Sequence, residues 1–208
     1  MFAPQAYAAE DPRRIILDHP FAFLVTMDAN GLHATPTPIY FETDAPEENR
    51  LVGHLALRNP QAQGIAGNQA CLALFSGPHA YVSGAWYRER REVPTWNYVA
   101  AEVRGFLDPL EDAAENEGVL NRISTMLNRT YEANWTLADA TPGRVEALLP
   151  HIRSFRITIG DICGVTKLSQ THPPGDRARV IRHLLERGSA PDIAIATLMQ
   201  ANETATER

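Results

Sequence analysis

The sequence has few cysteines and no long apolar run. Cys71 and Cys163 are the two cysteines in 208 residues, and they lack the spacing of metal ligands. We expect both to be buried free thiols, as in a cytoplasmic protein. No run of about 18 apolar residues occurs, and the N-terminus shows no basic segment followed by an apolar one. The sequence therefore predicts no membrane span, no secretory signal and no metal site.

The sequence also has fewer basic than acidic residues. The chain has 19 Lys and Arg residues against 25 Asp and Glu, a net charge of −6. Because phosphate contacts need clustered cations, this balance does not support DNA binding by the whole surface, although it leaves a local basic patch open. The one basic helix carries Arg177, Arg179, Arg182 and Arg187. We interpret it as a solvated helix face.

Catalytic motifs are missing as well. The sequence contains no Gly-x-Ser-x-Gly, no His-Glu-x-x-His and no Gly-rich phosphate loop, and its histidines are scattered singly. We therefore predict no catalytic residue and leave open whether the protein is an enzyme. If it is one, a bound cofactor would carry the chemistry and the protein would position it.

The first half of the chain has the pattern of antiparallel strands. Residues 21–27 alternate with the strand period, and residues 28–31 (DANG) are a hairpin turn signal. One face of this strand carries Phe21, Phe23, Val25 and Met27. Further strands are predicted at 32–41, 51–57, 70–77, 79–85 and 94–107.

Helices dominate the second half. Residues 108–111 (DPLE) resemble a capping box with Pro at the first helical position, and apolar residues at helical spacing follow. In the second half, helices are predicted after residue 108, in a short segment from 141, at 176–187 with Gly188 as the stop, and at 189–201. One more helix is predicted near the N-terminus, at 11–18. The last few residues of the chain are expected to fray. A returning strand is predicted at 152–168.

This order of elements predicts a mainly β fold with helices: an antiparallel barrel decorated by helices. Apolar inward side chains fill a barrel of this size. We therefore expect a flat ligand to lie on the outside of the barrel or at a subunit interface.

Aromatic and polar side chains alternate over residues 77–105. The aromatic residues are Tyr81, Trp86, Tyr87, Trp96 and Tyr98, and the polar ones between them are His79, Ser83, Thr95 and Asn97. Such a mixture suits a flat ligand with polar edges. The alternative interpretation is two core strands joined by a basic turn at 88–91.

Several of these segments together resemble a known family. They read HPFA from His19, GLHAT from Gly31, GPHAY from Gly77, PTWNY from Pro94 and KLSQ from Lys167, in this order. On these motifs the chain resembles the PaiB-like FMN-binding negative transcriptional regulators, relatives of the pyridoxamine-phosphate-oxidase-type split barrels. The family usually continues KLSQ with Asn-Arg-Pro, whereas this chain has Thr171-His172-Pro173.

The resemblance implies an antiparallel split β-barrel that binds FMN, with C-terminal helical additions, and a homodimer with flavin between its subunits. It covers most of residues 1–185. We accordingly predict a split-barrel domain with helical decorations over 1–188, and a C-terminal helix and tail over 189–208.

A first group of candidate site residues lies on two neighbouring strands. His54 and Arg58 share a face of the predicted third strand, and Thr35 and Thr37 share a face of the strand before it. Arg58 offers a forked, permanently charged phosphate donor. The resemblance implies a phosphate site in this part of the sheet. The alternative is that the threonines are ordinary strand residues and His54 is a satisfied core histidine.

A second group comes from the aromatic stretch and the returning strand: His79, Ser83, Trp96, Asn97, Lys167 and Gln170. Asn97 supplies both a donor and an acceptor for the flavin edge, and Trp96 suits ring contact or a dimer interface. Lys167 and Gln170 could close over the ligand, although a surface location is the commonest fate of a lysine.

Three functions compete at this point. The first is an FMN-binding, homodimeric negative transcriptional regulator. The alternative is a flavin-dependent oxidoreductase acting on a small molecule. The least favoured is a barrel that holds haem, with His33, His54 or His79 as axial ligand, or holds nothing.

Overall fold

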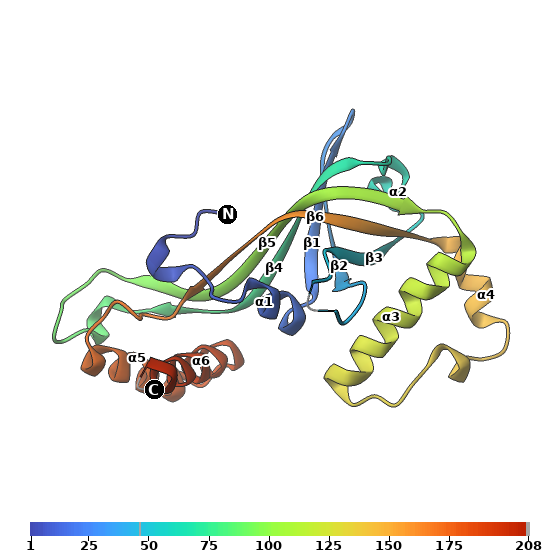
Figure 1. Ribbon diagram of the computed structural model, residues 1–208. Helices are drawn as coiled ribbons and strands as arrows, with labels where there is room; N and C mark the ends of the chain where they lie inside the picture. Colours follow the sequence, from blue (N-terminus) through green and yellow to red (C-terminus); the bar gives the residue numbers. More distant parts are fainter. Residues whose placement is uncertain (46, 207–208) are drawn as a thin grey trace. The chain divides into compact units, whose positions relative to one another are not determined.

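The computed structural model describes residues 1–45 and 47–206 (Figure 1). Six strands form a closed barrel in the order β1-β2-β3-β6-β5-β4 within these residues. The strands are β1 (Phe21–Asp28), β2 (Gly31–Phe41), β3 (Arg50–Ala56), β4 (Gln69–Val82), β5 (Thr95–Leu110) and β6 (Ile152–Lys167). The helices are α1 (Pro12–Asp18), α2 (Pro60–Gly64), α3 (Ala113–Tyr131), α4 (Arg144–Leu148), α5 (Pro174–Arg187) and α6 (Ala190–Thr206). The predicted barrel with helical additions is confirmed.

The chain divides into two compact units, which we describe separately. Unit 1 comprises Met1–Ile15, Ser76–Ala101 and the chain from Cys163 onward. Unit 2 comprises Ile16–Phe75 and Glu102–Ile162. The predicted domain boundary at residue 189 stays a prediction, and part of the segment expected to fray, residues 207–208, lies outside the described residues.

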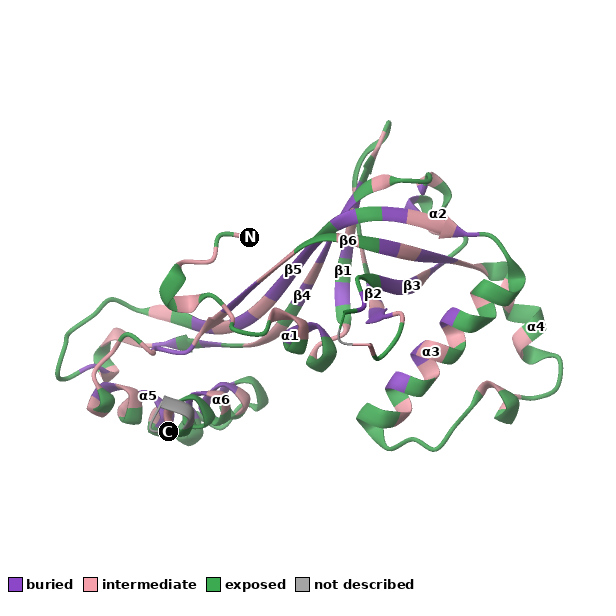
Figure 2. Cartoon of the chain, viewed as in Figure 1, coloured by how far each residue is buried: buried purple, intermediate pink, exposed green. Residues whose placement is uncertain are grey.

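The β1–β2 hairpin of unit 2 shows the predicted alternation. β1 pairs with β2 in antiparallel register, with Phe23 opposite Pro36 and Met27 opposite Leu32. Ala22, Leu24 and Thr26 of β1 are buried, whereas Phe21, Phe23 and Met27 are exposed. The bulkier apolar face of the strand therefore points outward, and Figure 2 shows similar alternation of buried and exposed positions along β5.

Helix α3 covers the β2–β3 end of unit 2. Tyr40 and Val52 pack with three apolar residues of the helix, which are Val119, Ile123 and Met126, and with Leu110. Asp112 caps the helix by accepting hydrogen bonds from the backbone N–H groups of Ala114 and Glu115. The predicted capping box at 108–111 is wrong, because Leu110 is buried in this core and β5 continues through it.

The acidic loop after β2 is tied to the same helix. Arg122 donates to Asp44 at 2.7 Å and Arg129 donates to it at 2.8 Å. These two hydrogen bonds lower the pKa of the Asp44 carboxyl to about 2. The loop therefore depends on a carboxylate that stays ionised in moderate acid.

Two further predictions about strands are wrong in detail. The segments 70–77 and 79–85 form one strand, β4, rather than two. The buried side chains have odd residue numbers up to Phe75 and even ones from Ala80 onward. The Gly-Pro pair between them therefore marks a change of the buried face within one strand, not a break between two strands. β3 ends at Ala56, which leaves Arg58 in the following turn.

Most helix predictions agree with the structure. α1, α5 and α6 lie where helices were expected, and Gly188 ends α5 with a φ of 70°. This left-handed conformation is one that glycine adopts without steric cost. The short helix predicted from residue 141 begins later, at Arg144, after Gly143.

Candidate functional site

The first predicted group lies in unit 2, on β2, β3 and the turn that follows. Thr37 is buried, and its hydroxyl donates to the backbone carbonyl of His54 at 2.7 Å. The His54 Nδ1 atom is buried and has no hydrogen-bond partner within residues 1–45 and 47–206. Burial lowers the pKa of the His54 imidazole, so the neutral ring is favoured. Thr37 is thus committed to the strand pair, whereas His54 keeps an unused polar atom.

Asn59, which the sequence analysis did not select, organises the turn after β3. Its Oδ1 atom accepts from the backbone N–H of Gln61 at 2.9 Å and so caps α2. Its Nδ2 atom donates to the Thr35 hydroxyl oxygen at 2.9 Å. The Asn-Pro sequence, a helix cap followed by Pro at the first helical position, could have revealed this role.

The turn thereby leaves phosphate donors unused. The Thr35 hydroxyl accepts from Asn59, so its own proton remains available to a ligand. Arg58 is exposed, and no ion pair of its guanidinium occurs among the described residues. With the unpartnered nitrogen of His54, these groups fit an anionic phosphate. If FMN is bound, they are the residues that would hold it.

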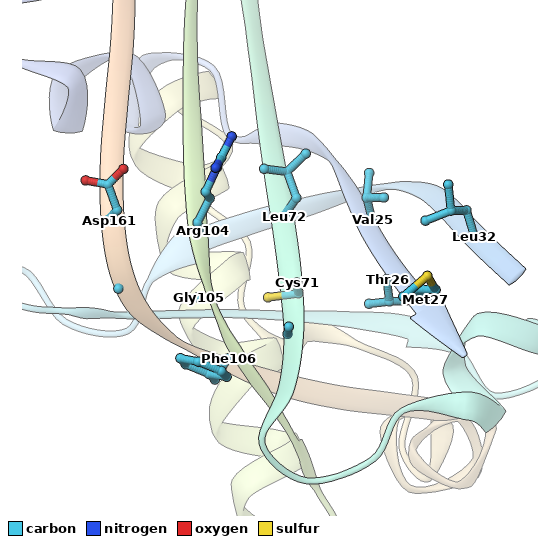
Figure 3. A pocket seen from close by; sticks show the side chains of 12 residues that line it. Val25, Thr26, Met27, Leu32, Cys71, Leu72, Arg104, Gly105, Phe106 and Asp161 are labelled. Atoms are coloured by element: carbon cyan, nitrogen blue, oxygen red, sulfur yellow. The ribbon is translucent and has the colours of Figure 1, made fainter. Parts of the chain in front are cut away.

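An open apolar pocket of about 590 Å³ lies elsewhere on unit 2. The strands β6, β5, β4, β1 and β2 contribute in turn Asp161, Arg104, Leu72, Val25 and Leu32, which Figure 3 shows side by side. Such a surface suits a flat apolar ring system. Its charged groups, a guanidinium and a carboxylate, come from β5 and β6.

The second predicted group lies in unit 1, and its aromatic members form one cluster. The Trp96 ring centroid lies 6.0 Å from that of His79 and 6.0 Å from that of Tyr81. Trp96 is 52% exposed. These side chains therefore present an accessible aromatic surface, suited to ring contact.

Asn97 lies on the opposite, covered face of the same strand. The side chain is 0% exposed, and its Nδ2 atom donates to Ser169 Oγ at 3.0 Å and to Met199 Sδ at 3.4 Å. Ser169 holds a φ of 59° at the end of the returning segment. The amide links β5 to that segment and to α6, so a role at a flavin edge would require these bonds to be replaced.

The remaining members of the second group have local partners. Lys167 Nζ donates to Thr95 Oγ1 at 2.6 Å. Gln170 donates to the carbonyls of Thr166 and Ala6 at 2.7 and 3.0 Å. Ser83 accepts from the backbone N–H of Ala85 at 3.3 Å. Thus four of the ten predicted residues lie in unit 2 and six lie in unit 1.

The basic helix α5 is paired with acidic side chains throughout. Its ion pairs are Arg177–Glu203, Arg179–Glu89, Arg179–Asp176, Arg182–Glu186 and Arg187–Asp192, with nitrogen–oxygen distances of 3.7 Å or less. These carboxylates compensate the positive charge of the helix. In the described chain, no group of three or more His, Cys, Asp or Glu residues could hold a metal ion, and no helix is long and apolar enough to cross a membrane.

The six-stranded antiparallel barrel with its helices is a split barrel. Residues 1–161 match the family described as "Putative FMN-binding domain", and the chain belongs to this family. FMN is its cofactor. A curated relative, "Protease synthase and sporulation protein PAI 2" of Bacillus subtilis, is 30% identical over 206 residues, which is 96% of this chain and 97% of the relative.

Solved structures share the fold. The flavocytochrome Anf3 from Azotobacter vinelandii has a TM-score of 0.57 at 16% identity, over 83% of this chain and 75% of that chain. The FAD and heme binding protein from Mycobacterium smegmatis has a TM-score of 0.55 at 14% identity, over 77% and 73% of the two chains. At these identities the likeness concerns the fold alone.

Proposed function

We propose that the protein is a homodimeric FMN-binding regulator in the cytoplasm that lowers transcription. The FMN phosphate is held by His54, Arg58 and Thr35. FMN supplies a redox-active ring when bound. The protein residues bind the phosphate, orient the ring and exclude water from one side of it.

The outward face of the β1–β2 hairpin is the observation that carries the homodimer. Phe21, Met27 and Leu32 are 63%, 67% and 76% exposed, and Phe23 lies between the first two on the same face. Contiguous exposed apolar patches of this kind mark interaction sites. A second copy would cover this face.

The regulatory part of the proposal rests on the motifs shared with the PaiB-like regulators and on the relationship over the whole chain to the Bacillus subtilis protein. The paired arginines of α5 do not favour phosphate contacts by that helix, since their cationic groups already face carboxylates. We therefore propose regulation through a partner protein or a metabolite, rather than through DNA contacts by α5.

The same pairing favours a second candidate function. Without a cationic DNA-binding helix, the flavin site itself would be the functional centre, and the protein would be a flavin-dependent oxidoreductase acting on a small molecule. Turnover of bound FMN with a nicotinamide donor would support this alternative. Salt-sensitive binding to a specific DNA fragment would support direct repression.

The first experiment combines an absorbance spectrum, an FMN titration and light scattering on the purified protein. We expect one FMN per chain and twice the monomer mass. Leu32→Glu should give a monomer, because it places a charge in the apolar face. Phe2→Glu is the matched control, since Phe2 is 86% exposed outside the hairpin. A monomeric wild-type protein, or a dimer unaffected by Leu32→Glu, would remove this face from the interface.

A further inference from the structure

We propose that Arg90, Lys167 and His172 of unit 1 form a binding site for a phosphate group or a similar oxyanion, bordered by the hydroxyls of Tyr7 and Thr171. We call these five residues the Arg90 cluster. The proposal does not depend on the FMN site of unit 2. It stands on the contacts and the unused donors of these residues.

Short contacts connect the members of the Arg90 cluster. Arg90 Nη2 donates to the carbonyl of Thr171 at 3.1 Å and lies 3.3 Å from His172 Nδ1. The hydroxyls of Tyr7 and Thr171 are 3.3 Å apart. Lys167 Nζ lies 5.6 Å from the centroid of the Tyr7 ring. Both cations therefore lie close to the residues that carry the hydroxyl pair.

The contact with Arg90 determines which ring nitrogen of His172 can donate to a ligand. Arginine has only donors, so His172 Nδ1 must accept from Arg90, and the neutral ring then carries its proton on Nε2. Burial, together with the nearby positive charge of Arg90, lowers the pKa of the His172 imidazole. The ring is stacked on Tyr87, with centroids 4.6 Å apart, which fixes its plane.

Donors remain unused on both cations. Arg90 uses Nε toward Glu92 and Nη2 toward Thr171 and His172, which leaves its Nη1 atom without a partner in the described parts of the chain. Lys167 has three N–H groups, of which one is directed at Thr95. Glu92 pairs with Arg90, whereas Lys167 forms no ion pair among the described residues.

A buried carboxylate holds the loop that carries Arg90. Asp176 is fully buried and accepts from the backbone N–H groups of Arg88, Glu89 and Arg90 at 2.7, 3.2 and 2.9 Å. Burial alone would raise the pKa of this carboxyl, but these hydrogen bonds and one from Arg179 hold it well below its ordinary value. Asp176 is therefore ionised and occupied, and it positions Arg90 without competing for an anion.

Titration with inorganic phosphate tests the site on the purified protein. The readouts are calorimetry and the ring signals of His172 in NMR spectra, assigned with His172→Gln. We expect saturable binding that weakens about tenfold or more in Arg90→Gln and in Lys167→Gln, the scale of a charged hydrogen bond. Arg91→Gln is the control, because this exposed neighbour belongs to the same loop but not to the cluster. Unfolding curves confirm that each variant is folded.

No saturable phosphate binding, or an equal loss in Arg91→Gln, would overturn the proposal. Affinities for FMN and riboflavin then identify the source of the phosphate. If the cluster takes the phosphate of FMN, Arg90→Gln weakens FMN but not riboflavin. If it takes a separate anion, both flavins bind Arg90→Gln unchanged and phosphate still binds the FMN-loaded protein. Failure of flavin binding alone would leave the phosphate result intact.

Discussion

Replacing Arg58 with alanine tests the flavin phosphate site most directly. The guanidinium is exposed in the turn after β3, and the described residues give it no ion pair whose loss would disturb the fold. The change should therefore act on the ligand alone. A hydrogen bond to a charged group contributes about 1.5–3 kcal/mol, which corresponds to roughly 10- to 150-fold in FMN affinity. Because the turn is open to water, we expect the lower end of this range.

Riboflavin, which lacks the phosphate, provides the internal control. Flavin fluorescence titrations would give the affinities of FMN and riboflavin for the wild-type protein, for Arg58→Ala and for Arg58→Lys. We expect the preference for FMN over riboflavin to collapse in the alanine variant and to be partly kept by lysine, which retains the charge but not the fork. An unchanged FMN affinity in a folded Arg58→Ala protein would remove Arg58 from the site. An equal loss for both flavins would place its effect on the ring or the fold.

Four further substitutions test the scaffold. Gly105→Ala should lower the free energy of unfolding by about 1–3 kcal/mol, because its Cβ would lie 2.2 Å from a backbone oxygen of β6. Gly118→Ala in helix α3 should raise the free energy of unfolding by about 0.5–1 kcal/mol, because nothing lies within 4 Å of the added Cβ. Urea unfolding in which both variants change the free energy of unfolding in the same direction would contradict this. The pKa of Asp44 is lowered to about 2 in the folded protein. Its ion pairs therefore stabilise the fold above the ordinary Asp pKa of about 3.9, and this stabilisation is lost as the pH falls toward 2. Asp44→Asn should therefore lose less unfolding free energy between pH 5 and pH 3 than the wild-type protein, and an equal loss would refute the role of the ion pairs. Asp176→Asn should speed hydrogen exchange of the amides at 88–90, and unchanged protection there would show that the carboxylate does not hold the loop.

Periodicity and turn chemistry were sufficient for the barrel, because they are local signals. The DANG turn and the alternation in β1 predict a hairpin without reference to any other element. The same local reasoning fails at residues 108–111, where a helix-start pattern lies inside β5. Burial of Leu110 against α3 decides that case, and this long-range contact leaves no mark in the local sequence.

The site was predicted less completely for a related reason. Strand alternation correctly separates Trp96 from Asn97, but it does not say which face is covered. The covering element is α6, whose Met199 accepts from the Asn97 amide although it lies 102 residues away in the chain. An amide with the donor and acceptor that a ligand edge needs is therefore hydrogen-bonded inside the protein.

The contrast between Asp176 and Arg58 explains which polar residues remain available to ligands. Asp176 is a buried, ionised carboxylate, but it already accepts hydrogen bonds from three backbone N–H groups and from Arg179. Arg58 has no such partner within the described chain, and His54 retains a buried nitrogen without a hydrogen bond. Because a buried polar atom left unpaired is costly, the proposed hydrogen bond from His54 to the FMN phosphate would remove that cost. FMN should therefore bind more tightly than riboflavin and stabilise the protein more at the same free ligand concentration.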